Sequence, residues 1–457
     1  MWNKSNALIY KCKDSDITST DVTELLNAKC RIDKIGAIEQ ILFSFPLRNR
    51  TIYEGISQHI GWPQHDENDF NHLWGSNAAK KIGIGTYSEN SLEEQLNVFS
   101  LGIQEKYCNK PLLIPLSGGL DSRFLLGAIG AHPNTKTYTY QSGLSTENYV
   151  AKKIAKAKNI KHYTIDIPTE IYKNDHLLLK HCGMVQLYHL AFISIANKLF
   201  TSEGETRRLL VHGFMGDPIF GSKASLSKKK ISADEEVENY LSLHLTRYPF
   251  FSRHIRAAEK MDILQDLSLE YEYYGCQDSV ADLAETLFIT RRQQMIYKII
   301  DCASQWVDIS TPFFDDFDLQ KVALSIPQSD RISRATFIKY CHEKFPSYEF
   351  YMNAENPFKM PEINSIILRR LCNYSQYLLE WGGINARISP FQHEQLRFNF
   401  LKNISYMQNQ IGCAQHLLDI PLDISASLSR SNNAADFGYS CATIGAAFNA
   451  NLKVEAH

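Results

Sequence analysis

Between residues 90 and 212 the apolar positions alternate between two spacings, which predicts alternating helices and strands. Stretches in which apolar residues recur every three or four positions lie at 91–107, 122–130, 147–158 and 190–200. Short apolar runs that fit buried strands lie at 112–116, 136–141, 162–167 and 209–212. Strands separated by helix-length segments predict an α/β fold, in which a parallel sheet is flanked by helices.

Beyond residue 235 the apolar spacing is mostly helical, with long periodic segments at 283–305 and 317–325. The stretch 222–236 interrupts the apolar pattern, because three lysines and then three acidic residues follow one another within it. We expect this stretch to be a mobile surface loop. So short a basic run is weak evidence for nucleic-acid binding.

The length, composition and net charge of the chain limit the kinds of molecule that it is expected to bind. The 457 residues leave room for two or three domains, and 44% hydrophobic content suffices for full cores. A formal net charge of −2 gives no electrostatic reason to expect nucleic acid or a membrane surface, so small molecules or peptides are the expected partners. The ten cysteines form no C-x-x-C pair and no apolar run would span a bilayer, which favours reduced thiols and a cytoplasmic protein.

The most informative motif follows the run 112–116 and reads Ser117-Gly118-Gly119-Leu120-Asp121-Ser122. Two successive glycines let backbone N–H groups approach phosphate oxygens, and the helix expected next presents its positive end to an anion. Asp121 supplies the oxygen ligand that a phosphate-bound Mg²⁺ prefers. No lysine follows the glycines, so the loop is not a Walker A motif. We therefore predict a pyrophosphate-binding loop, against the alternative of an ordinary turn.

A second glycine-containing loop, Gly213-Phe214-Met215-Gly216-Asp217, follows the run 209–212. The carboxyl ends of parallel strands lie at one edge of a sheet, where ligands of such folds bind. Asp121 and Asp217 are therefore expected to lie close enough to hold one Mg²⁺ against the phosphates of a nucleotide. His181, His189 and His212 lack metal-ligand spacing and are expected to be partly buried, hydrogen-bonded side chains.

Together these motifs resemble the synthetase domain of the asparagine synthetase family, a PP-loop ATP pyrophosphatase with a HUP-like fold. The likeness covers about residues 40–365. It also includes Phe45-Pro46-Leu47 with Thr51-Ile52-Tyr53, the segment from Tyr138 to Lys158, Thr311-Pro312-Phe313-Phe314-Asp315, and Ala323-Leu324-Ser325-Ile326-Pro327.

The resemblance implies an ATP-dependent, AMP-forming amide ligase. Such an enzyme adenylates a substrate carboxylate with release of pyrophosphate, and then couples the acyl group to ammonia or an amine. It implies that Asp121 and Asp217 hold Mg²⁺ and are catalytic, and we add Lys359 as a candidate catalytic residue. The residues that it places against ATP are Leu116, Ser117, Gly118, Gly119, Leu120, Asp121, Ser122, Tyr140, Gly213 and Gly216.

Three positions depart from the family pattern. Trp2 stands where the family has the cysteine nucleophile of its glutaminase domain, so nitrogen is expected from ammonia, an amine substrate or a partner protein. Phe214 replaces a glutamate suited to accept the amine proton. Glu355 stands where the family has a lysine, and Lys359, the candidate substitute, lies beyond Phe358.

These departures suggest a specialised relative that acts in natural-product, peptide or surface-sugar biosynthesis. We expect a truncated remnant of the glutaminase-type domain with a linker at 1–90, the synthetase domain at 91–350 and a helical C-terminal part at 351–457. Two alternatives stay open: an intramolecular cyclase of the lactam or lasso-peptide type, and a catalytically degenerate nucleotide-binding partner.

Overall fold

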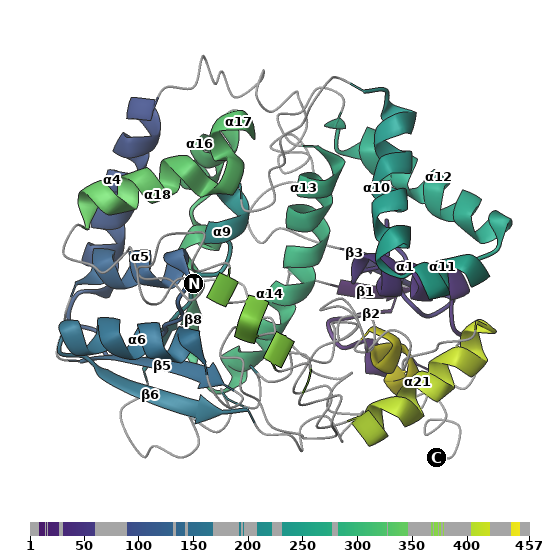
Figure 1. The fold of residues 1–457 in the computed structure, drawn as a ribbon, viewed down its shortest axis with the longest axis horizontal. Helices are drawn as coiled ribbons and strands as arrows, with labels where there is room; N and C mark the ends of the chain where they lie inside the picture. Colours follow the sequence, from purple (N-terminus) through teal and green to yellow (C-terminus); the bar gives the residue numbers. More distant parts are fainter. Residues whose placement is uncertain are drawn as a thin grey trace.

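A computed structural model of the chain describes residues 9–13, 15, 17–26, 31–59, 89–130, 134–141, 145–167, 192, 195, 208–221, 231–276, 282–326, 328–345, 367–368, 370–372, 374–375, 378, 404–420 and 440–447. An all-parallel five-stranded sheet confirms the predicted α/β fold (Figure 1). In their spatial order, the strands are β6 (Lys161–Asp166), β5 (Thr135–Gln141), β4 (Leu112–Pro115), β7 (Leu209–Val211) and β8 (Asp308–Ser310).

The order of the strands places a topological switch point in the middle of the sheet. From β4 the chain moves outward to β5 and β6, and it then returns to the other side of β4 as β7. The two glycine-containing loops follow β4 and β7, the neighbours at which this direction reverses. Open α/β sheets bind their ligands in the crevice at such a point.

Four of the predicted helices around the sheet are confirmed, while the one expected at 190–200 lies outside the described residues except for 192 and 195. Helix α4 (Glu89–Tyr107) packs on α5 (Leu120–Ile129) and on α16 (Phe317–Ser325), and α6 (Thr146–Ala157) packs on β5 and β6 (Figure 1). Phe99, Phe124 and Phe313 join the first group to α15 (Pro312–Asp315), with ring centroids 5.1–5.9 Å apart. These large apolar contacts fix α5, and with it the loop that precedes it.

Strand β8 was not predicted, and the sequence region containing it was expected to be mostly helical. Its three residues are too few to show a period-two pattern. Pairing with β7 makes the segment a strand, with Ile309 opposite Leu210 and Ser310 opposite Val211. The strand therefore exists because of a tertiary contact rather than a local preference.

The N-terminal part is an α+β arrangement. An antiparallel sheet in the order β2 (Thr18–Ser19), β1 (Ile9–Cys12) and β3 (Ile56–His59) lies beside α1 (Lys34–Phe43), and η1 (Val22–Glu24) follows β2. Whether this part descends from a glutaminase domain stays a prediction, as do the expected domain boundaries.

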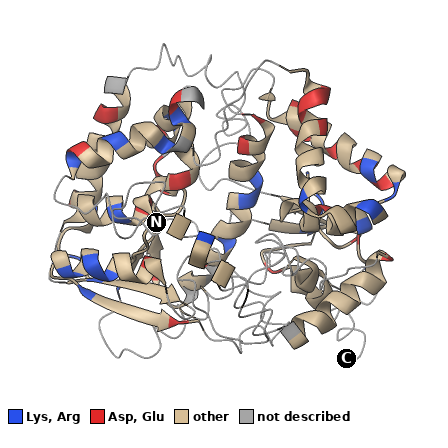
Figure 2. Ribbon diagram, viewed as in Figure 1, with Lys and Arg blue, Asp and Glu red and all other residues tan. Residues whose placement is uncertain are grey.

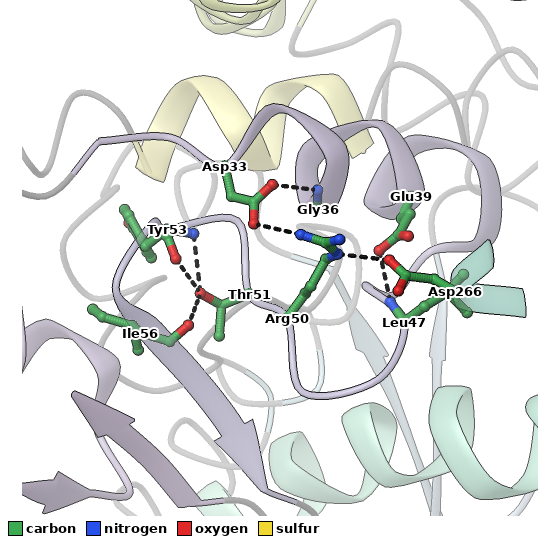
Figure 3. Close-up of polar contacts among 9 residues, drawn as sticks. All are labelled: Asp33, Gly36, Glu39, Leu47, Arg50, Thr51, Tyr53, Ile56 and Asp266. Atoms are coloured by element: carbon green, nitrogen blue, oxygen red, sulfur yellow. Dashed lines mark hydrogen bonds and ion pairs between the residues drawn. The ribbon is translucent and has the colours of Figure 1, made fainter. Parts of the chain in front are cut away.

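Arg50 ties this N-terminal part to the helical region (Figure 3). Its guanidinium contacts Asp33, the N-cap of α1, at 3.2 Å and Asp266 of α12 (Ala257–Tyr273) at 2.7 Å. Close by, the Thr51 hydroxyl donates to the Tyr53 and Ile56 carbonyls at 3.0 and 2.9 Å. The segment that contains Arg50 and Thr51 is thus held by polar contacts within a turn and by an ion pair to α12.

The helical region beyond residue 231 agrees with the predicted apolar spacing. Its elements are α10 (Ala233–Arg247), α11 (Pro249–His254), α12, α13 (Leu283–Leu287), η5 (Phe288–Arg292), α14 (Gln293–Cys302), η6 (Ala303–Gln305), α15, α16, α17 (Gln328–Arg331), η7 (Ile332–Arg334), α18 (Ala335–Lys344) and α21 (Ile404–Leu418). None of the described helices combines the length and apolar character that a membrane crossing requires.

The expected surface loop at 222–236 is wrong at its C-terminal end, because α10 already begins at Ala233. The Ser232 side chain caps this helix by accepting from the Glu235 N–H at 3.2 Å. The acidic residues at 234–236 form the first helical turn, where the helix dipole favours negative charge. Figure 2 shows them gathered at that end of α10.

Candidate functional site

A cavity of about 690 Å³ opens where β4 and β7 end. It brings together all the predicted nucleotide-site residues except Gly216, along with Asp217. Those residues are Leu116, Ser117, Gly118, Gly119, Leu120, Asp121, Ser122, Tyr140 and Gly213. Gly216 contacts Asp121 instead, and Lys359 and Glu355 lie outside the described residues. The fold therefore brings Asp121 and Asp217, which are 96 residues apart in the sequence, to the same cavity.

The hexapeptide at 117–122 is half loop and half helix. Helix α5 begins at Leu120 with Gly119 as its N-cap, so Leu120, Asp121 and Ser122 form the first turn and not part of the loop. Asp121 thus sits at the positive end of the helix. The expected arrangement of glycine-rich turn and helix N-terminus is confirmed, with the boundary two residues earlier than the apolar spacing indicated.

The two serine hydroxyls hold the shape of this turn. Ser117 Oγ accepts from the Gly119 N–H at 3.0 Å and lies 3.3 Å from Ser122 Oγ. The Ser122 hydroxyl donates to the Gly119 carbonyl at 3.3 Å and accepts from the Ser117 N–H at 3.2 Å. An anion that uses these hydroxyls would replace bonds that the turn makes to itself.

Asp121 is the most unusual ionisable group of the cavity. Its Oδ2 accepts from the Asp217 N–H at 2.6 Å, and its Oδ1 is buried with no hydrogen-bond partner in the part of the chain that the structure describes. Burial raises the pKa of this carboxyl well above its ordinary value of 3.8, and the nearby charge of Asp217 adds to the rise. Arg334 and Arg123 oppose it. A buried carboxylate oxygen without a partner is a ready ligand for a cation.

The second loop lies in close contact with Asp121 and the start of α5. A Cβ atom on Gly216 would lie 2.6 Å from Asp121 Cγ, and one on Gly213 would lie 3.1 Å from the Ser122 nitrogen. Met215, the residue before the short helix α9 (Gly216–Ile219), has a φ of 80°. This left-handed residue turns the chain at the end of β7. The contact between the loops therefore favours glycine at both positions, most strongly at Gly216.

Two arginines, Arg123 and Arg334, line the cavity together with the two aspartates. The sequence alone indicated no role for either arginine. Arg334 forms an ion pair with Asp217, and Arg334, Ile338 and His342, four residues apart along η7 and α18, all line the cavity. Arg123 of α5 also lines it; burial lowers the pKa of this guanidinium to about 10, which leaves it charged at neutral pH. The spacing of 334, 338 and 342 is visible in the sequence, but no sequence pattern shows what this face meets.

Phe214, the departure from the family glutamate, is a core residue. It is 7% exposed and packs against Tyr297 and Phe314 at ring-centroid distances of 5.8 and 5.6 Å. The side chain is not part of the cavity lining. The neighbouring His212 lines the cavity and is partly buried, as expected. The expected side-chain hydrogen bond is not seen at Nδ1, which has no hydrogen-bond partner among the described residues.

The side chains fit a cation that is shared with a bound phosphate. Asp121 and Asp217 supply carboxylate oxygens, and among the described residues no group of three or more His, Cys, Asp or Glu side chains forms a metal site. Magnesium typically takes one or two carboxylates together with phosphate oxygens and water, rather than a cage built only of protein.

No protein-family model matches the chain, and no curated protein matches it either. The likeness to asparagine synthetases thus depends on the motifs themselves and on where the fold places them.

Proposed function

We propose that the protein is an ATP-dependent, AMP-forming ligase of the PP-loop type, which adenylates a carboxylate and couples the acyl group to ammonia or an amine. The proposal depends mainly on one observation: the Ser117–Ser122 turn, Asp217 and Arg334 all line the same cavity at the switch point. These groups offer backbone donors, carboxylates and a guanidinium to one ligand. That combination suits a Mg²⁺-bound polyphosphate.

The negative charge of a departing pyrophosphate would be met by groups already in position. The N-terminus of α5, Arg123 and Arg334 all face the cavity and carry full or partial positive charge. Fixed donors need little reorganisation when charge develops, so they lower the barrier to breaking the bond between the first and second phosphates. The absence of a P-loop lysine favours cleavage between the first and second phosphates over transfer of the terminal phosphate.

Asp121 and Asp217 are the residues that would hold Mg²⁺. The bound ion would neutralise phosphate charge and align the leaving group. Asp121 has a free buried oxygen for this purpose, whereas Asp217 is paired with Arg334 and would exchange that partner. Arg334 would then be released to contact phosphate oxygens.

The amide-forming half of the reaction lacks the family's base, because Phe214 is packed in the core. An amine that is tethered to the acyl group needs less assistance, since its attack is favoured by proximity. For this reason the intramolecular cyclase stays beside the intermolecular ligase as a form of the same proposal.

The test is to incubate the protein with ATP, Mg²⁺ and a panel of carboxylates, with and without ammonia and amines, and to identify the products. We expect AMP and pyrophosphate. ADP and phosphate would contradict the mechanism. Asp121→Ala should abolish the reaction, whereas Asp318→Asn, at a carboxylate 77% exposed on α16, should leave it unchanged. AMP formed with one substrate and no added amine would favour the cyclase.

The buried position of Phe214 also supports a second candidate, a nucleotide-binding protein without turnover. That protein would bind Mg²⁺ and ATP, and Asp121→Ala would weaken the binding, yet no carboxylate in the panel would yield AMP. Calorimetric binding alongside the product assay separates the two functions.

A further inference from the structure

His212 occupies a defined place in the cavity. It follows β7 directly, and its backbone N–H donates to the Ser310 carbonyl of β8 at 2.9 Å, which anchors the residue to the sheet. The imidazole meets the Phe192 ring edge-on, at a centroid distance of 5.6 Å and an interplanar angle of 79°. The backbone of His212 is therefore fixed by the sheet, and its ring packs against Phe192 on one side.

The two ring nitrogens of His212 lie in different surroundings. Nδ1 is buried without a hydrogen-bond partner among the described residues, while the residue lines the cavity. Burial lowers the pKa of this imidazole to about 4, and no charged group contributes to the shift, so the ring is neutral at physiological pH.

A neutral imidazole has one protonated and one unprotonated nitrogen. A buried N–H without an acceptor costs more than a buried ring nitrogen without a donor, since orphaned donors are the rarer case in folded proteins. The proton therefore belongs on Nε2. In this tautomer His212 is a hydrogen-bond donor toward the cavity and a poor proton acceptor.

We propose that His212 is a catalytic hydrogen-bond donor that binds an oxygen atom of the substrate carboxyl group through its Nε2–H. This inference rests on the proposed ligase function. Arg123, Arg334 and the α5 N-terminus are positively charged and would bind the phosphates. A neutral donor such as His212 suits a carbonyl oxygen, because it carries no positive charge that would attract pyrophosphate. When an amine attacks the acyl carbon, an electron pair moves onto this oxygen, and a donor in place stabilises the charge.

His212 does not replace the general base that the family's glutamate supplies at the position of Phe214. A base with a pKa of about 4 removes a proton from an attacking amine inefficiently near neutral pH. The attacking amine's proton therefore goes to solvent or to another group, and His212 acts on the oxygen.

Nuclear magnetic resonance tests the tautomer without any substrate. In protein labelled with ¹⁵N at its 15 histidines, the signals missing from His212→Gln identify His212. We expect the Nε2–H tautomer throughout a titration from about pH 5.5 to 8, across the usual histidine pKa of about 6.5. An Nδ1–H tautomer, or protonation within this range, would overturn the inference.

Three substitutions test the role. Glutamine places an amide donor near the position of Nε2, asparagine places one near Nδ1, and alanine removes both. We expect AMP formation to fall about 10²–10³-fold in His212→Ala and His212→Asn, and much less in His212→Gln. Equal losses in all three variants would contradict a donor at Nε2.

Nucleotide binding separates the two possible ligands of His212. The affinity for Mg²⁺ and α,β-methylene-ATP should stay within about twofold of wild type in each variant, since this probe lacks the acyl group. A larger loss in His212→Ala would mean that His212 binds the nucleotide instead, which overturns the proposal. A wild-type protein that forms no AMP with any carboxylate defeats the ligase function, while the wrong tautomer in an active protein defeats only the role of His212.

Discussion

At the scale of single residues, Asp121 is suited to bind a cation, but burial of its carboxyl group lowers the stability of the fold. Its folded-state pKa is raised, so the proton-bound form stabilises the fold. That stabilisation is fully present below the ordinary pKa of 3.8 and is lost as the pH rises through the raised value. As the pH rises from 3.8 through the raised value, burial of this carboxyl therefore increasingly opposes folding, as is common for groups kept for function.

Replacing Asp121 by asparagine should stabilise the ligand-free protein. The amide oxygen still accepts from the Asp217 N–H, but no charge is buried. We expect the free energy of unfolding at pH 7 to rise by about 0.5–2 kcal/mol, with no rise at acid pH, while AMP formation is lost. Urea denaturation measures the first effect. Asp318→Asn, at an exposed carboxylate, should change the free energy by less than about 0.5 kcal/mol. Destabilisation by Asp121→Asn would refute the account.

The same group predicts a link between nucleotide binding and protons. A cation favours the ionised form of Asp121, so binding of Mg²⁺ and ATP should release a proton wherever the free protein still holds it. The affinity should then increase with pH, by at most about tenfold per pH unit. Calorimetry in buffers of different ionisation enthalpy counts the protons. An Asp121→Asn variant with the same proton release would assign the effect to another group.

At the scale of elements, α1 contains a buried acid with a comparable cost. Glu39 Oε2 accepts from the Leu47 N–H at 2.8 Å, and its Oε1 makes no hydrogen bond to any residue that the structure describes (Figure 3). Burial raises the pKa of Glu39 well above 4.5, and Asp266 and Asp33 add to the rise, whereas the Leu47 N–H and Arg50 oppose it. The stabilisation contributed by the protonated form is lost as the pH rises above 4.5 through the raised pKa.

Glu39→Gln should therefore remove a pH-dependent loss of stability. Glutamine keeps an acceptor for the Leu47 N–H and carries no charge. We expect the melting temperature to rise relative to wild type at neutral and alkaline pH by a few degrees, and the difference to vanish near pH 4. Glu238→Gln, at an exposed position on α10, serves as the control and should leave the melting temperature unchanged at every pH. A constant difference for Glu39→Gln would argue against titration of this residue.

At the scale of the whole molecule, one hydrophobic core extends from Tyr10 to Ala447. The helical segment 440–447 packs on α21, and the Tyr53 hydroxyl donates to the Ala447 carbonyl at 3.2 Å. The end of the described chain is thus built into the N-terminal part. Contacts between such distant segments make the parts of the molecule depend on one another for stability.

Two glycines of this region give a matched test. A Cβ on Gly445 would lie 1.9 Å from the Gln410 carbonyl oxygen, whereas one on Gly412 of α21 would meet nothing within 4 Å. Gly445→Ala should reduce the free energy of unfolding by about 1–3 kcal/mol, because the backbones must separate. Gly412→Ala should raise it by about 0.5–1 kcal/mol, through helix propensity. Equal effects in denaturant unfolding would show that the packing of 440–447 on α21 is wrong.

The sequence alone determined those features that short stretches of chain encode. Apolar spacing predicted helices that flank the parallel sheet and four of its five strands. Ser117–Ser122 indicated an anion-binding turn at a helix N-terminus, because backbone freedom and helix polarity are local properties. Only the tertiary structure decided which distant groups meet there. Arg334 is 117 residues from Asp217, Asp217 is 96 from Asp121, and β8 is a strand because β7 lies beside it. Such contacts depend on how the whole chain packs, and no local pattern of residues specifies them.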